Sequence, residues 1–296
     1  MENPRVVVVG DLLYDMLASL DSEVRPGTDT FTPIRAAGGG SGANAASWLA
    51  ACGVETHFVG RIGDDVFGDF LETDLREAGI NAHLARDRSL ATGKVFVLVG
   101  GAGERTMITD RGAAENVGPQ DIPASLFGRG HLHLVGYTLS GGTRREAAFA
   151  ALRLAREAGM AVSVDPSSVP MLEEVGPERF LAWTRGADLC FPNLEEGSLL
   201  AGAEGPDQIT RNLLDYYPAV VLKLGAEGAL YADAEGRRSH VPAVRARVAD
   251  TTGAGDALCA GFLSAWLEGA VPEEALRRGV GLAARAVEHV GGRPAE

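Results

Sequence analysis

Strand-like apolar runs and helix-like stretches alternate along the chain. The predicted strands are residues 6–9, 55–59, 132–135, 161–164, 189–191 and 219–224, together with a longer stretch at 237–248. The predicted helices are residues 43–51, 67–78, 144–158, 254–268 and 273–289, and Gly79 is placed to end the second of them. This alternation predicts an α/β fold with a mainly parallel central sheet.

Two regions interrupt the alternation. Residues 12–35 and 94–110 look like extended hairpins with little helix between them. We expect a small β-layer that acts as a lid over an active site, because lids exclude water from reacting groups. The alternative is an edge extension of the main sheet. The chain shows no repeat, low-complexity segment or clear linker, so residues 1–296 are expected to form a single domain.

The segment with the clearest chemistry is residues 250–256, which read Asp-Thr-Thr-Gly-Ala-Gly-Asp. Small residues ahead of a helix leave backbone N–H groups free, and such a helix start is a binding site for an anion. Asp256 lies inside this site, where a carboxylate has a use if it accepts a proton from an attacking hydroxyl. The alternative is an ordinary first-turn acid, which the helix dipole favours.

A second glycine-rich segment opens the first clear helix. Residues 39–46 read Gly-Gly-Ser-Gly-Ala-Asn-Ala-Ala, so the backbone can approach a ligand closely, and Asn44 offers a donor and acceptors suited to a neutral polyol. The alternative is a tight turn with Asn44 at the helix start. The segment also matches the dinucleotide fingerprint of a Rossmann oxidoreductase, but it follows the first strand by about thirty residues rather than directly.

Three further turns follow predicted strands. Residues 60–68 are interpreted as structural, with glycines in the turn and Asp65 near the helix start. Asn193 and Glu196 stand where ligands bind in open α/β sheets, and Glu196 could act on Mg²⁺ through water. Their alternative role is a helix cap. Residues 223–228 read Lys-Leu-Gly-Ala-Glu-Gly, which predicts either a nucleotide contact or a β-turn.

Composition excludes several classes of function. The chain has 296 residues, 46% of them hydrophobic, with a formal net charge of -13, a pI of about 5.0 and no visible basic patch. Nucleic acid and anionic membranes are therefore not expected partners. Three scattered cysteines argue against a disulfide framework or a zinc site. No signal peptide or membrane-length apolar run is visible, so we expect a cytoplasmic protein.

The order of these motifs resembles the ribokinase-type (PfkB) carbohydrate kinases over nearly the whole chain. Residues 250–256 are similar to the C-terminal signature of the family, and Gly39, Gly40 and Asn44 to its N-terminal signature. The resemblance implies a three-layer α/β/α fold with a β-lid, often shared in a homodimer. It also implies ATP and Mg²⁺ as co-substrates and a sugar whose primary hydroxyl is phosphorylated.

The resemblance implies a role for each matching residue. Asp256 would be the catalytic base, beside an anion hole formed by Gly253, Ala254 and Gly255. The sugar would be held by Asp15, Gly39, Gly40 and Asn44. The nucleotide, its phosphates and Mg²⁺ would be bound by Asn193, Glu196, Lys223, Gly225 and Gly228, and a K⁺ ion by Asp250 and by carbonyls near residues 290–293. Because Asp256 lies at a helix N-terminus, we expect its pKa to be lowered.

Some residues depart from the pattern of ribokinases. Lys223 occupies a place often filled by a small hydroxyl residue, and Tyr137 stands where ribokinases tend to carry an acidic sugar contact. Arg105 begins a segment similar to those of ketodeoxygluconate, fructose and nucleoside kinases, and would point from the lid toward the substrate. The prediction is an ATP-dependent kinase of a sugar or sugar acid. The alternatives are a nucleoside kinase and a non-catalytic sensor of sugar or nucleotide.

Overall fold

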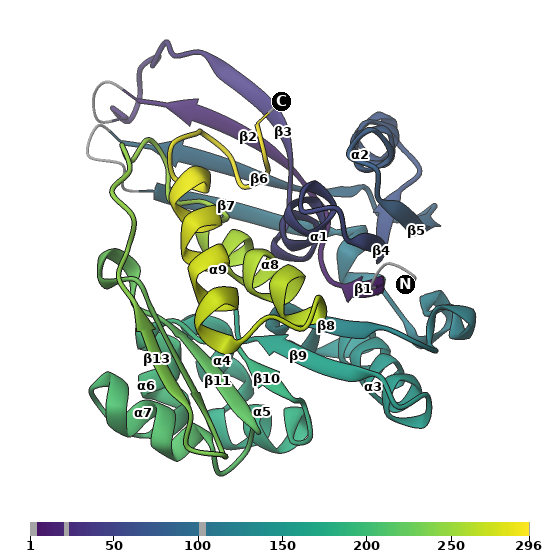
Figure 1. Ribbon diagram of the computed structural model, residues 1–296. Helices are drawn as coiled ribbons and strands as arrows, with labels where there is room; N and C mark the ends of the chain where they lie inside the picture. Colours follow the sequence, from purple (N-terminus) through teal and green to yellow (C-terminus); the bar gives the residue numbers. More distant parts are fainter. Residues whose placement is uncertain (1–4, 21–23, 101–104, 296) are drawn as a thin grey trace.

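A nine-stranded sheet forms the centre of the computed structural model, which describes residues 5–20, 24–100 and 105–295 (Figure 1). The strand order is β13-β12-β11-β10-β9-β8-β1-β4-β5, parallel from β11 to β5 and antiparallel at β12 and β13. The strands are β1 Arg5–Val9, β4 Glu55–Gly63, β5 Asn81–Asp87, β8 His131–Val135, β9 Ala161–Asp165, β10 Leu189–Cys190, β11 Ala219–Lys223, β12 Ala229–Asp233 and β13 Arg238–Val241.

Helices cover both faces of this sheet. They are α1 Ser41–Ala51, α2 Val66–Glu77, α3 Gly142–Glu157, α4 Val169–Val175, α5 Pro177–Thr184, α6 Leu194–Ala201, α7 Pro206–Leu213, α8 Ala254–Leu267 and α9 Pro272–Ala286. Successive side chains of a strand point to opposite faces. Val6 and Val8 of β1 therefore join the core under α1, α2, α8 and α9, while Val7 and Val9 join the core under α3 to α7. The predicted three-layer α/β/α arrangement is confirmed.

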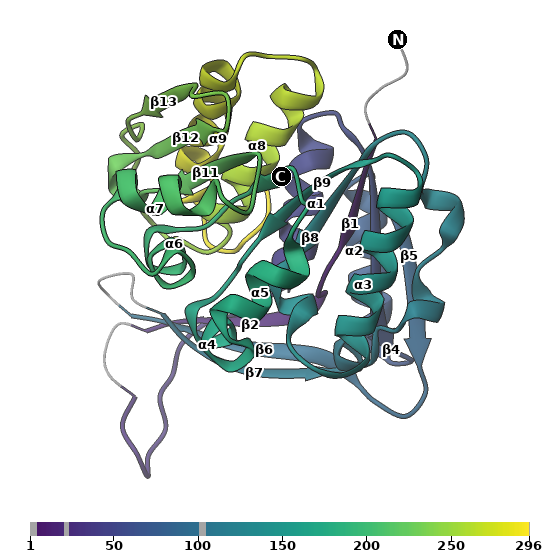
Figure 2. The same cartoon turned by 90° about the horizontal axis from the view of Figure 1, so that it is seen from below.

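A second, four-stranded sheet contains the two interrupting regions. Its order is β3-β2-β6-β7, with β2 Leu13–Ser19, β3 Ile34–Gly39, β6 Thr92–Val99 and β7 Arg105–Gly112. β2 and β6 are parallel, and both outer pairs are antiparallel. Figure 2 shows its strands running across the direction of the large sheet. These regions form a separate sheet with its own small core, so an edge extension of the main sheet is the wrong interpretation.

Local capping explains where the predicted helices begin and end. Asp65 accepts a hydrogen bond from the Gly68 N–H at 2.9 Å and so caps α2, as predicted. Gly79 follows α2 with a φ of 75°, the left-handed conformation expected of a helix-ending glycine. None of the helices in the described part of the chain is long and apolar enough to cross a bilayer.

One predicted strand is mostly wrong. Only Arg238–Val241 of the stretch 237–248 forms a strand, and residues 242–248 pair with no strand in the described part of the chain. Pro242 has no N–H to donate to a sheet, and residues 243–248 instead follow the wall of a cavity described below. Residues 21–23 and 101–104 of the predicted hairpins, and residues 1–4 at the start of the chain, lie outside the described residues.

Candidate active site

The two glycine-rich segments meet at Asp256. Its carboxylate accepts a hydrogen bond from the Ser41 hydroxyl at 2.7 Å and another from the Asn44 amide at 3.3 Å. Ser41 and Asn44 belong to the first turn of α1, and Asp256 to the first turn of α8. The two helix starts therefore face one another, although more than 200 residues separate them in sequence. Two donors hold the Asp256 carboxylate in one orientation, as a catalytic base requires.

The pKa of Asp256 is shifted in the opposite direction to the one expected from the sequence. The helix start was expected to lower its pKa, but burial of the carboxylate, with repulsion from Asp165, raises that pKa to about 7. The hydrogen bonds from Ser41 and Asn44 act in the opposite direction and are outweighed. A base whose pKa lies near neutral pH is well matched to proton transfer.

The predicted anion-hole loop is shaped by contacts with the chain's last residues. Gly253 has a φ of 73°, and a Cβ atom added there would meet the Gly292 carbonyl oxygen at 2.2 Å. Only glycine fits at this approach of two backbones. Asp250 is fully buried and accepts hydrogen bonds from Thr252 N–H at 2.9 Å and Gly291 N–H at 2.9 Å. Asp250 therefore ties the loop to the late turn.

Arg105 approaches the same loop from β7. Its guanidinium donates to the Thr252 hydroxyl at 2.6 Å and lies 3.8 Å from the Asp250 carboxylate. The sequence placed Arg105 on a lid strand pointing toward the acceptor, and the strand is as expected. In the structure Arg105 joins the small sheet to the loop that precedes α8, and its contact with an acceptor stays a prediction.

Asp15 of β2 lies beside the glycines that precede α1. A Cβ atom on Gly39 would meet the Asp15 carboxylate at 2.1 Å, and a Cβ on Gly40 would meet the Asp11 carbonyl oxygen at 2.5 Å. The Asp15 Oδ1 atom is buried and accepts no hydrogen bond from the part of the chain that the structure describes. Burial raises the Asp15 pKa to about 7, although the Arg293 charge lowers it. The buried acceptor is suited to a ligand hydroxyl.

A buried ion pair stands next to the anion-hole loop. The Lys223 ammonium donates to Asp165 at 2.7 Å, and it is the nearest group to a Cβ added at Gly255, 3.3 Å away. Burial opposes the Lys223 charge, but Asp165 raises the Lys223 pKa above its usual value. Lys223 therefore brings a fixed positive charge to the predicted phosphate site, in place of the small hydroxyl residue that the resemblance leads one to expect there.

Asn193 and Glu196 form a capping box at the start of α6. The Asn193 side chain accepts from the Glu196 N–H at 2.9 Å, and the Glu196 carboxylate accepts from the Asn193 N–H at 2.9 Å. The capping interpretation is thus the one that this geometry displays. Glu196 is also buried, and burial raises its pKa.

A cavity of about 480 Å³ is lined at one end by Lys223 and Gly255. Gly225 and Gly228, with φ values of 59° and 95°, form the turn after β11 at its edge. Most of its wall is apolar. The apolar side chains in this wall were not singled out from the sequence, and they include Val244, Val248, Leu258, Val280, Ala283 and Val287. A largely apolar cavity that ends at a helix N-terminus and a lysine is suited to a flat ring system with attached phosphates.

Comparison with known proteins decides the family. The profile described as pfkB family carbohydrate kinase matches residues 3–296. The chain belongs to this family. An ATP-dependent ribose-1-phosphate kinase from Halopiger xanaduensis is 31% identical over 284 residues, which cover 92% of this chain and 88% of that protein.

Solved structures of kinases have the same fold as this PfkB protein. Adenosine kinase from Sinorhizobium meliloti matches with a TM-score of 0.91 at 25% identity, covering 99% of this chain and 97% of that one. A fructokinase from Vibrio cholerae O395, in a form with fructose, ADP and calcium ion, matches with a TM-score of 0.83 at 28% identity, covering 98% and 94%. The predicted family, fold and enzyme class are confirmed: the protein is an ATP-dependent carbohydrate kinase.

The structure also excludes the Rossmann alternative for this PfkB kinase. Residues 40–45 open α1 after β3, which is a strand of the small sheet. The dinucleotide fingerprint needs a turn directly after the first strand of a parallel sheet. The match to the fingerprint is therefore a coincidence of small residues at a helix start.

Three site residues of the PfkB kinase were not found from the sequence. Asp11 accepts from the Gly42 N–H at 3.2 Å and pairs with Arg111 at 3.1 Å. Arg293 donates to the Gly39 carbonyl oxygen at 3.3 Å and contacts Asp74. Asp11 directly follows the glycine that ends β1, which is a usable signal. Nothing local marks the contacts of Arg111 with Asp11 and of Arg293 with Gly39, because they span 100 and 254 residues.

Proposed function

We propose that this kinase transfers the γ-phosphoryl group of ATP to a primary hydroxyl of a sugar or sugar acid, with Asp256 as catalytic base. One observation carries the proposal: a carboxylate with a pKa of about 7 is oriented by two donors at the entrance of a glycine-lined helix start. Such a carboxylate can accept the proton of an attacking hydroxyl while the N–H groups of residues 253–255 bind the transferring phosphoryl oxygens.

The nucleotide is assigned to the cavity of about 480 Å³. The ring system would lie against its apolar wall, with Gly225 and Gly228 at the edge. The phosphates would extend toward Lys223 and the first turn of α8. Lys223 then neutralises phosphate charge without leaving Asp165, because an ammonium has three donors.

The residues present fit a divalent metal ion on the phosphates. The Glu196 carboxylate is buried beside Lys223 and Asp165, and its raised pKa reflects the cost of keeping it there as an anion. We propose that Glu196 holds Mg²⁺ through water, as Mg²⁺ usually keeps several waters. When bound, the ion would offset negative charge on the phosphates.

The acceptor is assigned to the pocket beside Asp256. Asp15, Gly40 and Asn44 would bind its hydroxyls, since Asp15 Oδ1 and Asn44 Oδ1 are both buried without a partner in residues 5–20, 24–100 and 105–295. Sugar hydroxyls can donate to both of these oxygens. A nucleoside acceptor is the second candidate, supported by the structural similarity to adenosine kinase. The sensor alternative is disfavoured because Asp256 and residues 253–255 are all retained.

A substrate panel with a catalytic-base variant tests the proposal. The pure protein would receive ATP and Mg²⁺ with ribose, fructose, ketodeoxygluconate, inositol or adenosine, and ADP release would be measured. We expect Asp256→Asn to lower kcat by about 10²–10⁴-fold on the best acceptor, the usual range for loss of a general base. Near-normal kcat in the variant would remove Asp256 from this role, and turnover of no acceptor by folded protein would favour the sensor.

We further propose a homodimer that forms through the small sheet. Ile34, Phe96 and Ile108 are 64%, 47% and 61% exposed, and strand pairing places them on one face. Exposed apolar side chains gathered on a sheet face are typical of association sites. Light scattering after size exclusion should give twice the 30.9 kDa chain mass, and Phe96→Lys should give the single mass. A monomeric wild type would contradict the proposal.

A K⁺ ion near Asp250 and a cytoplasmic location also stay proposals. Both carboxylate oxygens of Asp250 already accept hydrogen bonds, so the ion would depend mainly on the carbonyls of residues 290–293. If K⁺ orders the loop, replacing it with tetramethylammonium at constant ionic strength should lower kcat without unfolding the protein. Equal activity with K⁺, Na⁺ and tetramethylammonium would contradict it.

A further inference from the structure

A second cavity has a volume of about 460 Å³ and is lined by none of the residues assigned to the acceptor. Its wall is formed by the turn after β8, the start of α3 and the start of α4, and includes Arg111, Tyr137 and Arg144. Arg111 connects it to the acceptor pocket, because its guanidinium pairs with Asp11 and covers the Tyr137 ring at 4.4 Å. The cavity has room for a substituent of an acceptor that is bound beside Asp11.

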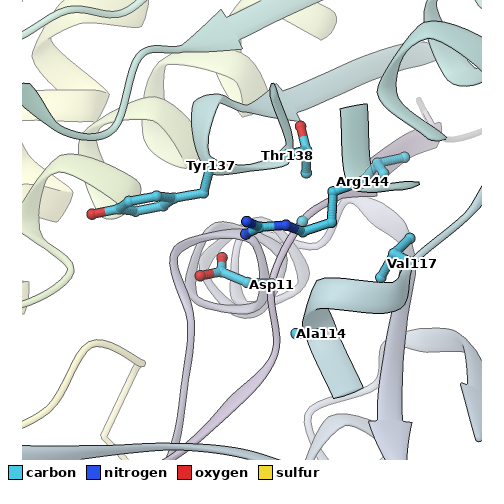
Figure 3. Close-up of a pocket in the computed structure, with 8 residues that line it drawn as sticks. Asp11, Ala114, Val117, Tyr137, Thr138 and Arg144 are labelled. Atoms are coloured by element: carbon cyan, nitrogen blue, oxygen red, sulfur yellow. The ribbon is translucent and has the colours of Figure 1, made fainter. Parts of the chain in front are cut away.

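Arg144 is the unusual group in this wall. It is only 9% exposed, and its Nε and Nη1 atoms have no hydrogen-bond partner among the described residues. Figure 3 shows its guanidinium directed between Tyr137 and Asp11, at a smaller adjoining cavity that Arg144 and Tyr137 also line. Its Nη2 atom donates to the Ser140 carbonyl oxygen at 2.8 Å and pairs with Glu115 at 2.9 Å. A buried guanidinium with free donors is costly unless a ligand completes its bonding.

The N-terminus of α3 points into the same cavity. Gly141 and Gly142 line it, no side chain caps this 16-residue helix, and its first turn contains no acid. The first N–H groups of a helix lack partners within the helix, and its dipole places positive charge there. Two arginines and an uncapped helix start therefore line the same cavity, and Arg144 also lines the smaller one beside it.

Both arginines are already paired with acidic residues, which a bound anion would have to displace or share. Asp11 is engaged by Arg111, and Glu115 by Arg144. Glu174 lines the cavity too, but its side chain is exposed to solvent. The Glu115 side chain is 47% exposed, so it can turn into solvent when another anion takes its place on Arg144. Its present contact shows that the Arg144 guanidinium is within reach of a carboxylate on this side.

We propose that this second cavity, formed by Arg111, Arg144 and the start of α3, binds an anionic group of the acceptor, a phosphate ester or a carboxylate. The proposal rests on the proposed function, since it names the acceptor class of the same active site. An acidic sugar is then held at two places: its anion beside α3 and its primary hydroxyl beside Asp256. Neutral sugars lack the first contact and are poorer substrates.

Matched acceptors test the preference directly. Ribose, ribose 1-phosphate and ketodeoxygluconate would be compared by kcat/KM at saturating ATP. We expect at least one of the two anionic acceptors to exceed ribose by about 100-fold, as charge-assisted hydrogen bonds to a phosphate or carboxylate are among the strong ones. The phosphate and carboxylate arms distinguish the two sources of the anion. Ribose equal to or better than both overturns the inference and leaves the kinase proposal intact.

Substitutions at two exposed positions should change anion binding in opposite directions without preventing folding. Thr143→Glu places a carboxylate at the start of α3, where an acid stabilises the helix but repels a bound anion. Thr143→Glu should lower kcat/KM for the anionic acceptor by about tenfold, and Thr143→Gln is the neutral control. Glu115→Gln removes the carboxylate that competes for Arg144, so it should raise kcat/KM for the same acceptor. Anionic acceptors unaffected by both variants would overturn the inference.

A binding measurement separates this inference from the proposed reaction. Inorganic phosphate would be titrated calorimetrically into wild type, Thr143→Glu and Glu115→Gln without nucleotide. We expect weaker binding in Thr143→Glu than in Thr143→Gln, and tighter binding in Glu115→Gln. This result supports the anion site even if no sugar of the panel is phosphorylated. Identical phosphate affinity in all variants contradicts it whatever the kinase activity.

Discussion

Ser41 is expected to set the pH at which the enzyme becomes active. Its hydroxyl donates to the Asp256 carboxylate at 2.7 Å and so stabilises the ionised form of Asp256. A hydrogen bond to a charged group contributes about 1.5–3 kcal/mol, and one pKa unit corresponds to about 1.4 kcal/mol. Ser41→Ala should therefore raise the pKa of Asp256 from about 7 by about one to two units.

The consequence for activity follows from the fraction of ionised base. At pH 7 about half of Asp256 is ionised in the wild type, and about a tenth to a hundredth would be ionised in Ser41→Ala. The kcat/KM at pH 7 should fall by about 5- to 50-fold, while the value at pH 9 to 9.5 should recover much of the loss. The acid limb of the profile moves to higher pH because the variant loses a donor that favoured the anion.

The assay is kcat/KM for the best acceptor between pH 5 and 9.5, since this parameter reports ionisation in the free enzyme. Ser41→Thr keeps a hydroxyl at the same position and serves as the matched control, with its acid limb expected near that of the wild type. A uniform loss at every pH, with the limb in its original place, would refute the reasoning. It would show that Ser41 orients the substrate or the loop rather than tuning Asp256.

Three other predictions concern the acceptor pocket and the stability of the core. Asp15→Ala should raise the acceptor KM or lower kcat while leaving ATP affinity nearly intact, because Asp15 lies beside Gly39, just before α1. Equal loss of acceptor and ATP affinity would point to a structural role. Lys223→Met should lower the free energy of unfolding in urea by about 3–5 kcal/mol, because it leaves Asp165 buried and unpaired. Adding Asp165→Asn should recover much of this loss. If the losses of the two single variants simply add in the double variant, the pairing is contradicted. Burial lowers the pKa of His131 to about 3 and of His133 to about 4, so protons bind the unfolded chain first as pH falls below 6.5. These two histidines should contribute a loss of about 3–4 kcal/mol in the free energy of unfolding between pH 7 and 5, whereas Asp15, Asp256 and Glu196, whose pKa values burial raises, act in the opposite direction. The histidine contribution is measured in urea titrations as the difference in pH dependence between the wild type and a variant with phenylalanine at both positions, and an equal pH dependence in the two proteins would contradict it.

The sequence was sufficient for the local parts of the site. The run at 250–256, the glycines before α1 and the cap at Asp65 are decided by helix-start chemistry within a few residues, and local chemistry is readable from sequence. The same holds for β1, whose four consecutive valines fit a strand buried on both faces. Their order along the chain then identified the family.

Tertiary structure alone decided how these parts act together. Ser41 reaches Asp256 across 215 positions of sequence, and Arg293 reaches Gly39 across 254. No local pattern encodes such contacts, because they depend on how helices pack on the sheet. The sign of the Asp256 pKa shift was wrong from sequence for the same reason: the helix dipole is a local property, whereas the burial that outweighs it is produced by the whole fold.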